Sequence, residues 1–206
     1  IVNASIALKN ENYIEAKDYI DQAYNNETTS DAAKMWNYRS RIYLQIAKKQ
    51  PEIDNAALLK ATEAYIKCMQ RDKKGRVIVR KWTSEEDILT GLVNCGYLLF
   101  NQAIDNYNNE EYRMSLKYND MIFSIIPYDS EGELKKGNIT EETILYNSFF
   151  ASNKVKDDVK SKEILQKLIN LDFNEPAIYI HMSNIYLSEE NSDKALEYLS
   201  LGREKF

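Results

Sequence analysis

The chain has 206 residues and a formal net charge of −5 at pH 7, which suits one or two globular domains and argues against nucleic acid as its main ligand. Its six glycines and three prolines are too few for a β-sandwich or a barrel, which need frequent turns. One histidine and two cysteines exclude a four-cysteine zinc site and a disulfide scaffold. No apolar run is long enough to span a membrane.

The sequence repeats one spacing of aromatic, small and aliphatic residues, and each copy predicts a pair of helices. In chain order, the predicted pairs cover residues 1–28, 33–72, 84–127, 141–173 and 176–206. In the last pair, Ser183 and Gly202 lie where two helices cross closely, while Tyr179, Tyr186 and Leu199 fill the space between them. Two signature positions four residues apart recur in the second helices and are held by Ala16 and Ile20, Ala61 and Tyr65, Ser115 and Asn119, Ser161 and Leu165, and Ala195 and Leu199.

Three stretches interrupt this spacing and are predicted insertions, at residues 47–55, 73–83 and 128–139. The second insertion belongs to a basic run, residues 67–81, in which seven Lys and Arg residues accompany one acidic residue. Such a run is usually solvated, but it also offers a contact for an anionic partner. A helix start is predicted after each of the last two insertions, because residues 84–87 are typical of a capping box and Thr140 is typical of an N-cap.

With these positions, the sequence resembles tetratricopeptide repeat (TPR) proteins over essentially its whole length. The last pair carries the pattern most completely, in Tyr179, Met182, Ser183, Tyr186, Ala195, Leu199 and Gly202. The resemblance implies an all-α fold, namely a right-handed α-solenoid of about five helix-turn-helix units that form a single array. Arg39 departs from the pattern, which has leucine at that position.

Two short strings, residues 31–39 and 196–206, resemble small TPR proteins that are exported to the envelope of Gram-negative bacteria. That resemblance implies a periplasmic or cell-envelope location, with the cytoplasm as the alternative. The chain also begins at Ile1, without a methionine and within a helical pattern. We therefore expect that an upstream segment has been removed, either as a signal peptide or by trimming.

The resemblance also implies a concave groove, lined by one face of the first helix of each unit, that holds a peptide or a protein segment. The candidate groove residues are Lys34, Asn37, Arg41, Tyr97, Phe100, Tyr107, Tyr146, Phe150 and Asn184. Aromatic residues and arginine favour peptide binding because they bury a large area with few rotatable bonds. The alternative is that these rings pack against the insertions inside the chain.

The sequence thus predicts a non-enzymatic interaction module whose partner is a protein or peptide, with a homo-oligomer left open. The first alternative is an assembly scaffold that acts through the basic run 67–81 and the loop 128–139. Glycan binding through the tyrosines is a second and weaker alternative. Deletion or mutation of either surface distinguishes these readings.

No catalytic residue, metal ligand or cofactor is predicted. His181 lacks a recognisable serine, cysteine or acidic companion and is interpreted as structural. Nucleotide, zinc-protease, esterase and thioredoxin motifs do not occur. Cys68 and Cys95 fall on helices that neighbouring units would pack together, so they are either small buried hydrophobes or, in an oxidising compartment, a disulfide.

Overall fold

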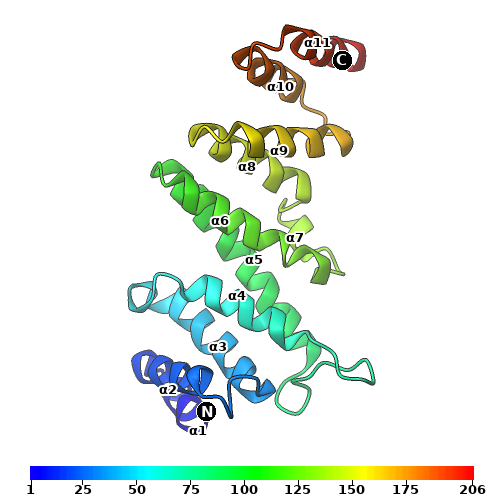
Figure 1. Ribbon diagram of the computed structural model, residues 1–206. Helices are drawn as coiled ribbons and strands as arrows, with labels where there is room; N and C mark the ends of the chain where they lie inside the picture. Colours follow the sequence, from blue (N-terminus) through cyan, green and yellow to red (C-terminus); the bar gives the residue numbers. More distant parts are fainter. The chain divides into compact units, whose positions relative to one another are not determined.

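The computed structural model describes residues 1–206, and it confirms the prediction of an all-α fold. Its regular elements are α-helices and two short 3-10 helices. In the segment that follows the fourth α-helix, one isolated β-bridge joins Arg71 and Val77. The chain forms two compact parts (Figure 1). The first part comprises residues 1–99 and 121–134, and the second comprises residues 100–120 and 135–206.

The first part begins with α1 (Val2–Lys9), α2 (Tyr13–Asn25), α3 (Ala33–Lys49), the short η1 (Pro51–Ile53) and α4 (Ala57–Cys68). Each of these α-helices packs against the next one along the chain, as the blue-to-cyan segments of Figure 1 show. Most of α5 (Glu85–Asn108), residues 121–134 with η2 (Ile126–Tyr128), and the first two residues of α7 (Glu133–Lys136) complete this part. Its core is made of side chains with essentially no exposure, among them Ile20, Met35, Ile42, Tyr43, Ile46 and Leu92.

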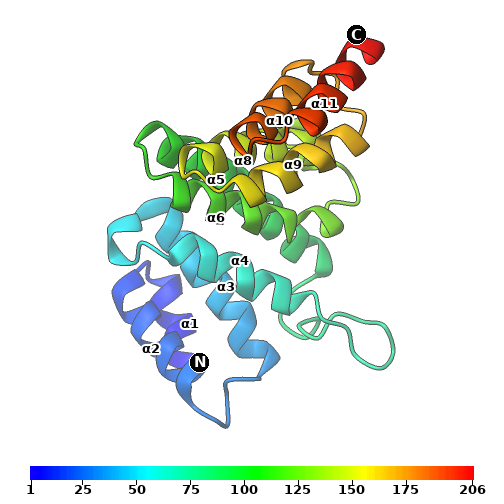
Figure 2. The ribbon, with the colours of Figure 1, turned by 45° about the horizontal axis from the view of Figure 1, so that its top comes forward.

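The second part contains the end of α5 and most of α6 (Tyr112–Phe123). It continues with α8 (Glu141–Lys154), α9 (Asp158–Asn170), α10 (Ala177–Ser188) and α11 (Ser192–Lys205). Here α8 packs on α9, α9 on α10 and α10 on α11 (Figure 2). The fully buried side chains include Ile144, Phe149, Leu165, Leu168 and Ile178.

Five helix-to-helix turns share one backbone geometry. In each, a residue other than glycine adopts a positive φ: Glu11 (56°), Glu110 (64°), Lys156 (58°), Asp172 (57°) and Glu190 (59°). The N–H of the following residue then donates to a carbonyl in the last turn of the preceding helix, which satisfies an otherwise unpaired helix end. These bonds are Asn12 to Ala7 (2.9 Å), Glu111 to Asn106 (2.8 Å), Asp157 to Ser152 (3.0 Å), Phe173 to Leu168 (3.0 Å) and Asn191 to Tyr186 (2.9 Å). This connection therefore occurs in both parts, whereas α3 and α4 are joined through η1 instead.

Both predicted helix starts are confirmed. Ser84 Oγ accepts a hydrogen bond from the backbone N–H of Asp87 at 3.0 Å, and the N–H of Ser84 donates to Asp87 Oδ2 at 3.4 Å, which is a capping box. Thr140 Oγ1 accepts from the N–H of Thr143 at 3.2 Å and caps α8. Each cap pairs backbone donors that the first helical turn leaves unsatisfied.

Arg39, the residue that departs from the repeat pattern, lies in a polar network of the first part and is 7% exposed. Its guanidinium donates to Asp21 Oδ1 at 2.6 Å and stacks on the rings of Tyr24 and Tyr43 at 4.1 and 4.6 Å from their centroids. Tyr43 also donates to Asp21 (2.6 Å), as does Lys17 (2.9 Å). Burial opposes the charge of Asp21, but the hydrogen bonds from Tyr43, Lys17 and Arg39 together lower its pKa.

The third predicted insertion contains a structured element rather than an open loop. Asp129 accepts hydrogen bonds from the backbone N–H groups of Glu133 (2.8 Å) and Leu134 (2.9 Å), and it thereby caps α7. Leu134 is 1% exposed and lies against Gly96, where an added Cβ would be only 2.6 Å from a Leu134 methyl. A larger residue than glycine at position 96 would thus force the Leu134 side chain to shift.

Candidate binding pocket

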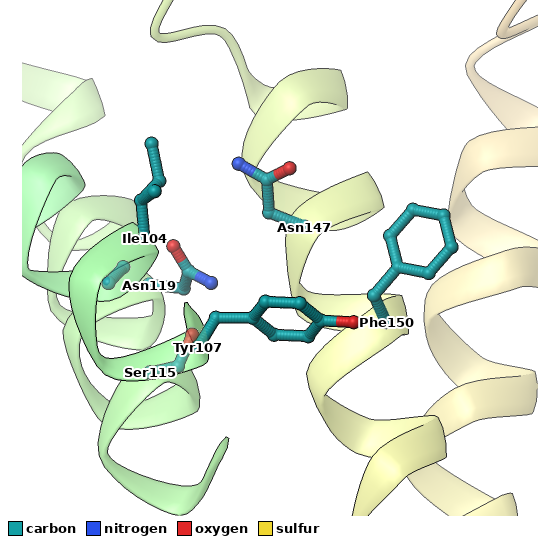
Figure 3. Close-up of a pocket in the computed structure, with 7 residues that line it drawn as sticks. Ile104, Tyr107, Ser115, Asn119, Asn147 and Phe150 are labelled. Atoms are coloured by element: carbon teal, nitrogen blue, oxygen red, sulfur yellow. The ribbon is translucent and has the colours of Figure 1, made fainter. Parts of the chain in front are cut away.

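A pocket of ≈ 440 Å³ opens between three helices of the second part (Figure 3). Its lining residues are Ala103, Ile104 and Tyr107 from α5, Ser115 and Asn119 from α6, and Asn147 and Phe150 from α8. This volume falls in the range of known ligand pockets. None of the lining residues carries a charge, so the pocket is suited to an uncharged group.

The floor of the pocket is buried and its rim is partly exposed. Ala103, Ser115 and Asn119 form the floor, with exposed fractions of 2%, 2% and 0%. At the rim, Ile104 is 39% exposed, and Tyr107, Asn147 and Phe150 are half-buried. In Figure 3 the ring of Tyr107 extends from α5 toward Phe150 of α8. Apolar side chains therefore frame a floor that is partly polar.

The amide of Asn119 is the least satisfied polar group of this floor. Both Nδ2 and Oδ1 are buried and have no hydrogen-bond partner in the chain. A buried amide without partners loses the hydrogen bonds it would make to water, at a cost of about 1–3 kcal/mol. An unpaired donor and an unpaired acceptor thus lie side by side at the bottom of the pocket.

An aromatic cluster continues from the rim along α8. Tyr146 contacts the rings of Phe150 and Phe173, with centroid distances of 4.8 and 5.3 Å. Phe149, which is 1% exposed, contacts the ring of His181 at 4.7 Å. Such contacts restrict the rings to a few orientations. The ring of Phe150 is therefore held by contacts with the rings of Tyr146, Phe149 and His181.

The structure brings together some of the predicted groove residues. Tyr107 and Phe150 line the pocket, and Tyr146 lies beside Phe150. Tyr97 is 37% exposed, and its hydroxyl donates to the backbone carbonyl of Glu133 at 2.6 Å. For Tyr97, the structure thus shows a contact with the insertion 128–139, as the alternative reading of these rings expects.

The other predicted groove residues are separate from this pocket. Arg41 is exposed and lines a polar pocket of ≈ 360 Å³ in the first part, together with Tyr38, Gln45 and Lys49. Asn37 is buried and its Nδ2 has no partner. The remaining members differ in exposure: Lys34 and Phe100 are half-buried, and Asn184 is exposed.

Five pocket residues were not among the sequence candidates, namely Ala103, Ile104, Ser115, Asn119 and Asn147. Asn119 carried a usable signal, because it occupies the repeat position that holds Ile20, Tyr65, Leu165 and Leu199 in the other copies. A short polar side chain where the others have a large apolar one indicates either a cavity or a buried polar site. Asn147 has no comparable signal.

His181 is interpreted as a member of the aromatic cluster. Burial lowers its pKa, and the charge of Glu175 opposes this only in part. The imidazole is therefore neutral at pH 7 and packs against the rings of Phe149 and Phe150.

Lowering the pH from 7 to about 5 should destabilise the chain through His181. The pKa of His181 is lowered in the folded state, so the unfolded chain takes up the proton first, and this contribution is lost as the pH falls below 6.5. His181→Phe should flatten the pH dependence of the unfolding free energy in this range, measured by urea denaturation. An unchanged slope would show that other groups cause the dependence.

Both cysteines are buried free thiols, so the disulfide considered from the sequence is not formed. Burial raises the pKa of each thiol to about 12. Thiolates are the reactive form of cysteine, and a raised pKa suppresses them at neutral pH. Cys68 and Cys95 therefore act as small core residues.

Much of the basic run is paired with carboxylates inside the first part. Arg71 forms a bidentate ion pair with Glu85 (2.6 and 3.1 Å). Arg76 and Arg80 both form ion pairs with Asp72 (2.9 and 3.0 Å). Hydrogen bonds from the backbone and side chain of Arg76 lower the pKa of Asp72 to about 2. Val77 and Val79, at 4% and 0% exposure, anchor the loop in the core.

No helix of the chain is both long and apolar enough to cross a bilayer, and no group of three or more His, Cys, Asp or Glu side chains is arranged to hold a metal ion. Comparison with protein-family models gives no match. A search of curated proteins finds no significant relative.

Proposed function

We propose that the chain is a non-enzymatic binding module of the TPR type, and that its second part binds a segment of a partner protein or peptide at the pocket around Tyr107 and Phe150. The observation that carries this proposal is the ≈ 440 Å³ uncharged pocket with an aromatic rim. A right-handed solenoid of five units and an envelope location are proposed with it, from the sequence resemblance.

The helix connections support the TPR assignment. The same left-handed turn joins α1 to α2, α5 to α6, α8 to α9, α9 to α10 and α10 to α11. Lys156 and Glu190, which occupy this turn in successive pairs, are 34 residues apart, and 34 residues is the length of one TPR. The five small residues of the second helices (Ala16, Ala61, Ser115, Ser161 and Ala195) are all buried at 2% exposure or less.

The pocket itself supports binding over a purely structural role. Its rings are fixed by neighbouring rings but remain partly exposed, and such surfaces usually mark contact sites. Aromatic side chains contribute strongly to binding because they bury a large area at a small loss of conformational entropy. A single peptide held in this way would bind at about micromolar affinity.

Replacing both Tyr107 and Phe150 with alanine should reduce binding of peptides selected from a random library by at least about tenfold, since each truncation removes a buried aromatic contact. The measurement is fluorescence anisotropy of labelled peptides against the whole chain. Circular dichroism checks that helicity is retained.

The matched control is Val159→Ala with Leu171→Ala, which shortens two exposed apolar side chains of the same part, at 68% and 40% exposure. Neither residue lines the pocket, so this double variant should bind as the parent chain does. Equal binding by the parent and the Tyr107/Phe150 variant would contradict the proposal.

The scaffold alternative depends on the basic run, where Lys73, Lys74 and Lys81 are exposed. Deletion of residues 73–81 would also remove the buried Val77 and Val79, so charge reversal is the sharper test. Changing the three lysines to glutamate should leave peptide binding within about twofold and the oligomeric state unchanged, as measured by light scattering. A loss of association would favour the scaffold reading.

A further inference from the structure

Asn119 holds the repeat position at which the other helix pairs place a large apolar residue, and the pocket lies above it. Its side chain is 0% exposed, and neither amide atom has a partner. In Figure 3 the amide projects from α6 toward the space that separates it from Asn147 of α8. The chain thus places an unsatisfied donor and acceptor under an apolar rim.

A planar group that offers one acceptor and one donor on the same edge is the natural complement of this amide. A primary carboxamide does so, because its oxygen accepts from Nδ2 and its NH₂ donates to Oδ1. A carboxylate offers only acceptors, and an ammonium group offers only donors. Two hydrogen bonds formed together would also remove the desolvation cost that Asn119 carries alone.

The uncharged lining of the pocket also favours a neutral carboxamide over an ionised group. None of the seven lining residues is charged, so an ionised ligand group would lose its hydration without an ion-pair partner. The carbons of a longer side chain would meet Ile104, Tyr107 and Phe150 at the rim. A glutamine side chain combines an apolar stem with a terminal carboxamide, and it reaches further than an asparagine.

Asn119 is 0% exposed in the free chain, so a ligand contacts it only when neighbouring side chains move. Tyr107 and Ile104, which line the same pocket, are partly exposed, and partly exposed side chains change rotamer readily. The backbone of a bound segment would remain at the rim, where its flanking residues find room. A single inserted side chain therefore accounts for the depth of the pocket.

We infer that the pocket receives a glutamine side chain of the bound segment, with Asn119 as its hydrogen-bonding partner. This inference rests on the proposed function, because it names the residue that the binding site selects. Tyr107 and Phe150 supply the apolar contact, and Asn119 supplies the discrimination between a carboxamide and an isosteric acid or thioether.

The test uses three peptide libraries with random flanks and a fixed central residue, which is Gln, Glu or Met. The Gln library should bind the whole chain about tenfold more tightly than the other two, because only it satisfies both amide atoms. Asn119→Leu should remove this preference, and Asn170→Leu, an exposed exchange on α9, should retain it. Circular dichroism confirms that both variants fold.

A second readout does not depend on peptide binding. Butanamide at millimolar concentration should shift the NMR signals of the Asn119 side-chain NH₂ in a saturable manner, whereas butanoate at pH 7 should not. Equal shifts by both probes would mean that the pocket does not select a carboxamide, and no shift by either would mean that it holds water only. Either result would overturn the inference.

The two proposals fail in different ways. If all three libraries bind alike and binding still requires Tyr107 and Phe150, the binding function stands and the selection of glutamine is wrong. If no library binds and butanamide leaves the Asn119 signals unchanged, both proposals are wrong.

Discussion

Asp21→Asn should lower the free energy of unfolding by about 2–3 kcal/mol, because it leaves a nearly buried guanidinium without its counter-charge. The Arg39 side chain is 8% exposed, and its ion pair to Asp21 measures 2.6 Å. The new NH₂ group would also face the donors of Tyr43 and Lys17, which now bond to Asp21. Urea denaturation at pH 7 measures the loss.

Two further variants distinguish the loss of the Asp21–Arg39 ion pair from the effect of removing any carboxylate of this helix. Asp18→Asn changes an exposed carboxylate on the same helix and should alter stability by less than about 0.5 kcal/mol. Arg39→Leu restores the leucine of the repeat pattern, and combined with Asp21→Asn it should recover part of the loss, since no unpaired charge remains. If Asp21→Asn alone costs no more than Asp18→Asn, the network contributes nothing to stability.

The stability that Asp21 contributes should also depend on pH in a defined direction. The pKa of Asp21 is lowered in the folded state from an ordinary value of 3.8, so its contribution is present above that value and is lost as the pH falls through the folded pKa. The parent chain and Asp21→Asn should therefore differ fully at pH 7. Their stabilities should converge in acid.

The helices were predictable because their signals are local. Residues 84–87 and Thr140 carry complete capping patterns within a few positions, and in each second helix a small residue precedes a larger one by four positions. Local hydrogen bonds and hydrophobic periodicity determine these features, so the sequence alone contains them. The all-α class follows from the same signals.

The surroundings of Arg39 and the helix α7 could not be predicted from such local signals. Arg39 departs from the repeat pattern because Asp21 and Tyr24, on the preceding helix, provide its ion pair and its stacking surface, and pairing between helices leaves no trace in local spacing. The four residues of α7 are too few to show a helical period. Its cap by Asp129 and its packing on Gly96 became visible only in three dimensions.

Only part of the candidate site was predictable, because only some of its residues occupy groove positions of the repeat. Tyr107 and Phe150 follow from the groove positions of the repeat, whereas Asn147 comes from a face of α8 that the pattern does not mark. Tyr97 belongs to the same predicted row, yet the carbonyl of Glu133 engages its hydroxyl. An insertion changes the surroundings of a repeat position without changing the position itself.

Asn119→Leu should raise the free energy of unfolding by about 1–3 kcal/mol, because it removes an unsatisfied amide from the core. Leucine has nearly the same shape as asparagine, and the pocket above gives its methyl groups room. The substitution also restores the apolar residue that the other helix pairs hold at this position. Urea denaturation measures the gain, with Asn170→Leu as the exposed control.

The direction of this change distinguishes two reasons for the presence of asparagine. If the amide were satisfied by bound water in the free chain, its removal would cost those hydrogen bonds, and Asn119→Leu would be neutral or destabilising. If Asn119→Leu stabilises the chain and also removes the preference for glutamine, the amide of Asn119 lowers the stability of the free fold. A buried residue that weakens the fold and improves recognition is typical of a binding site, because ligand contacts offset its cost only in the complex.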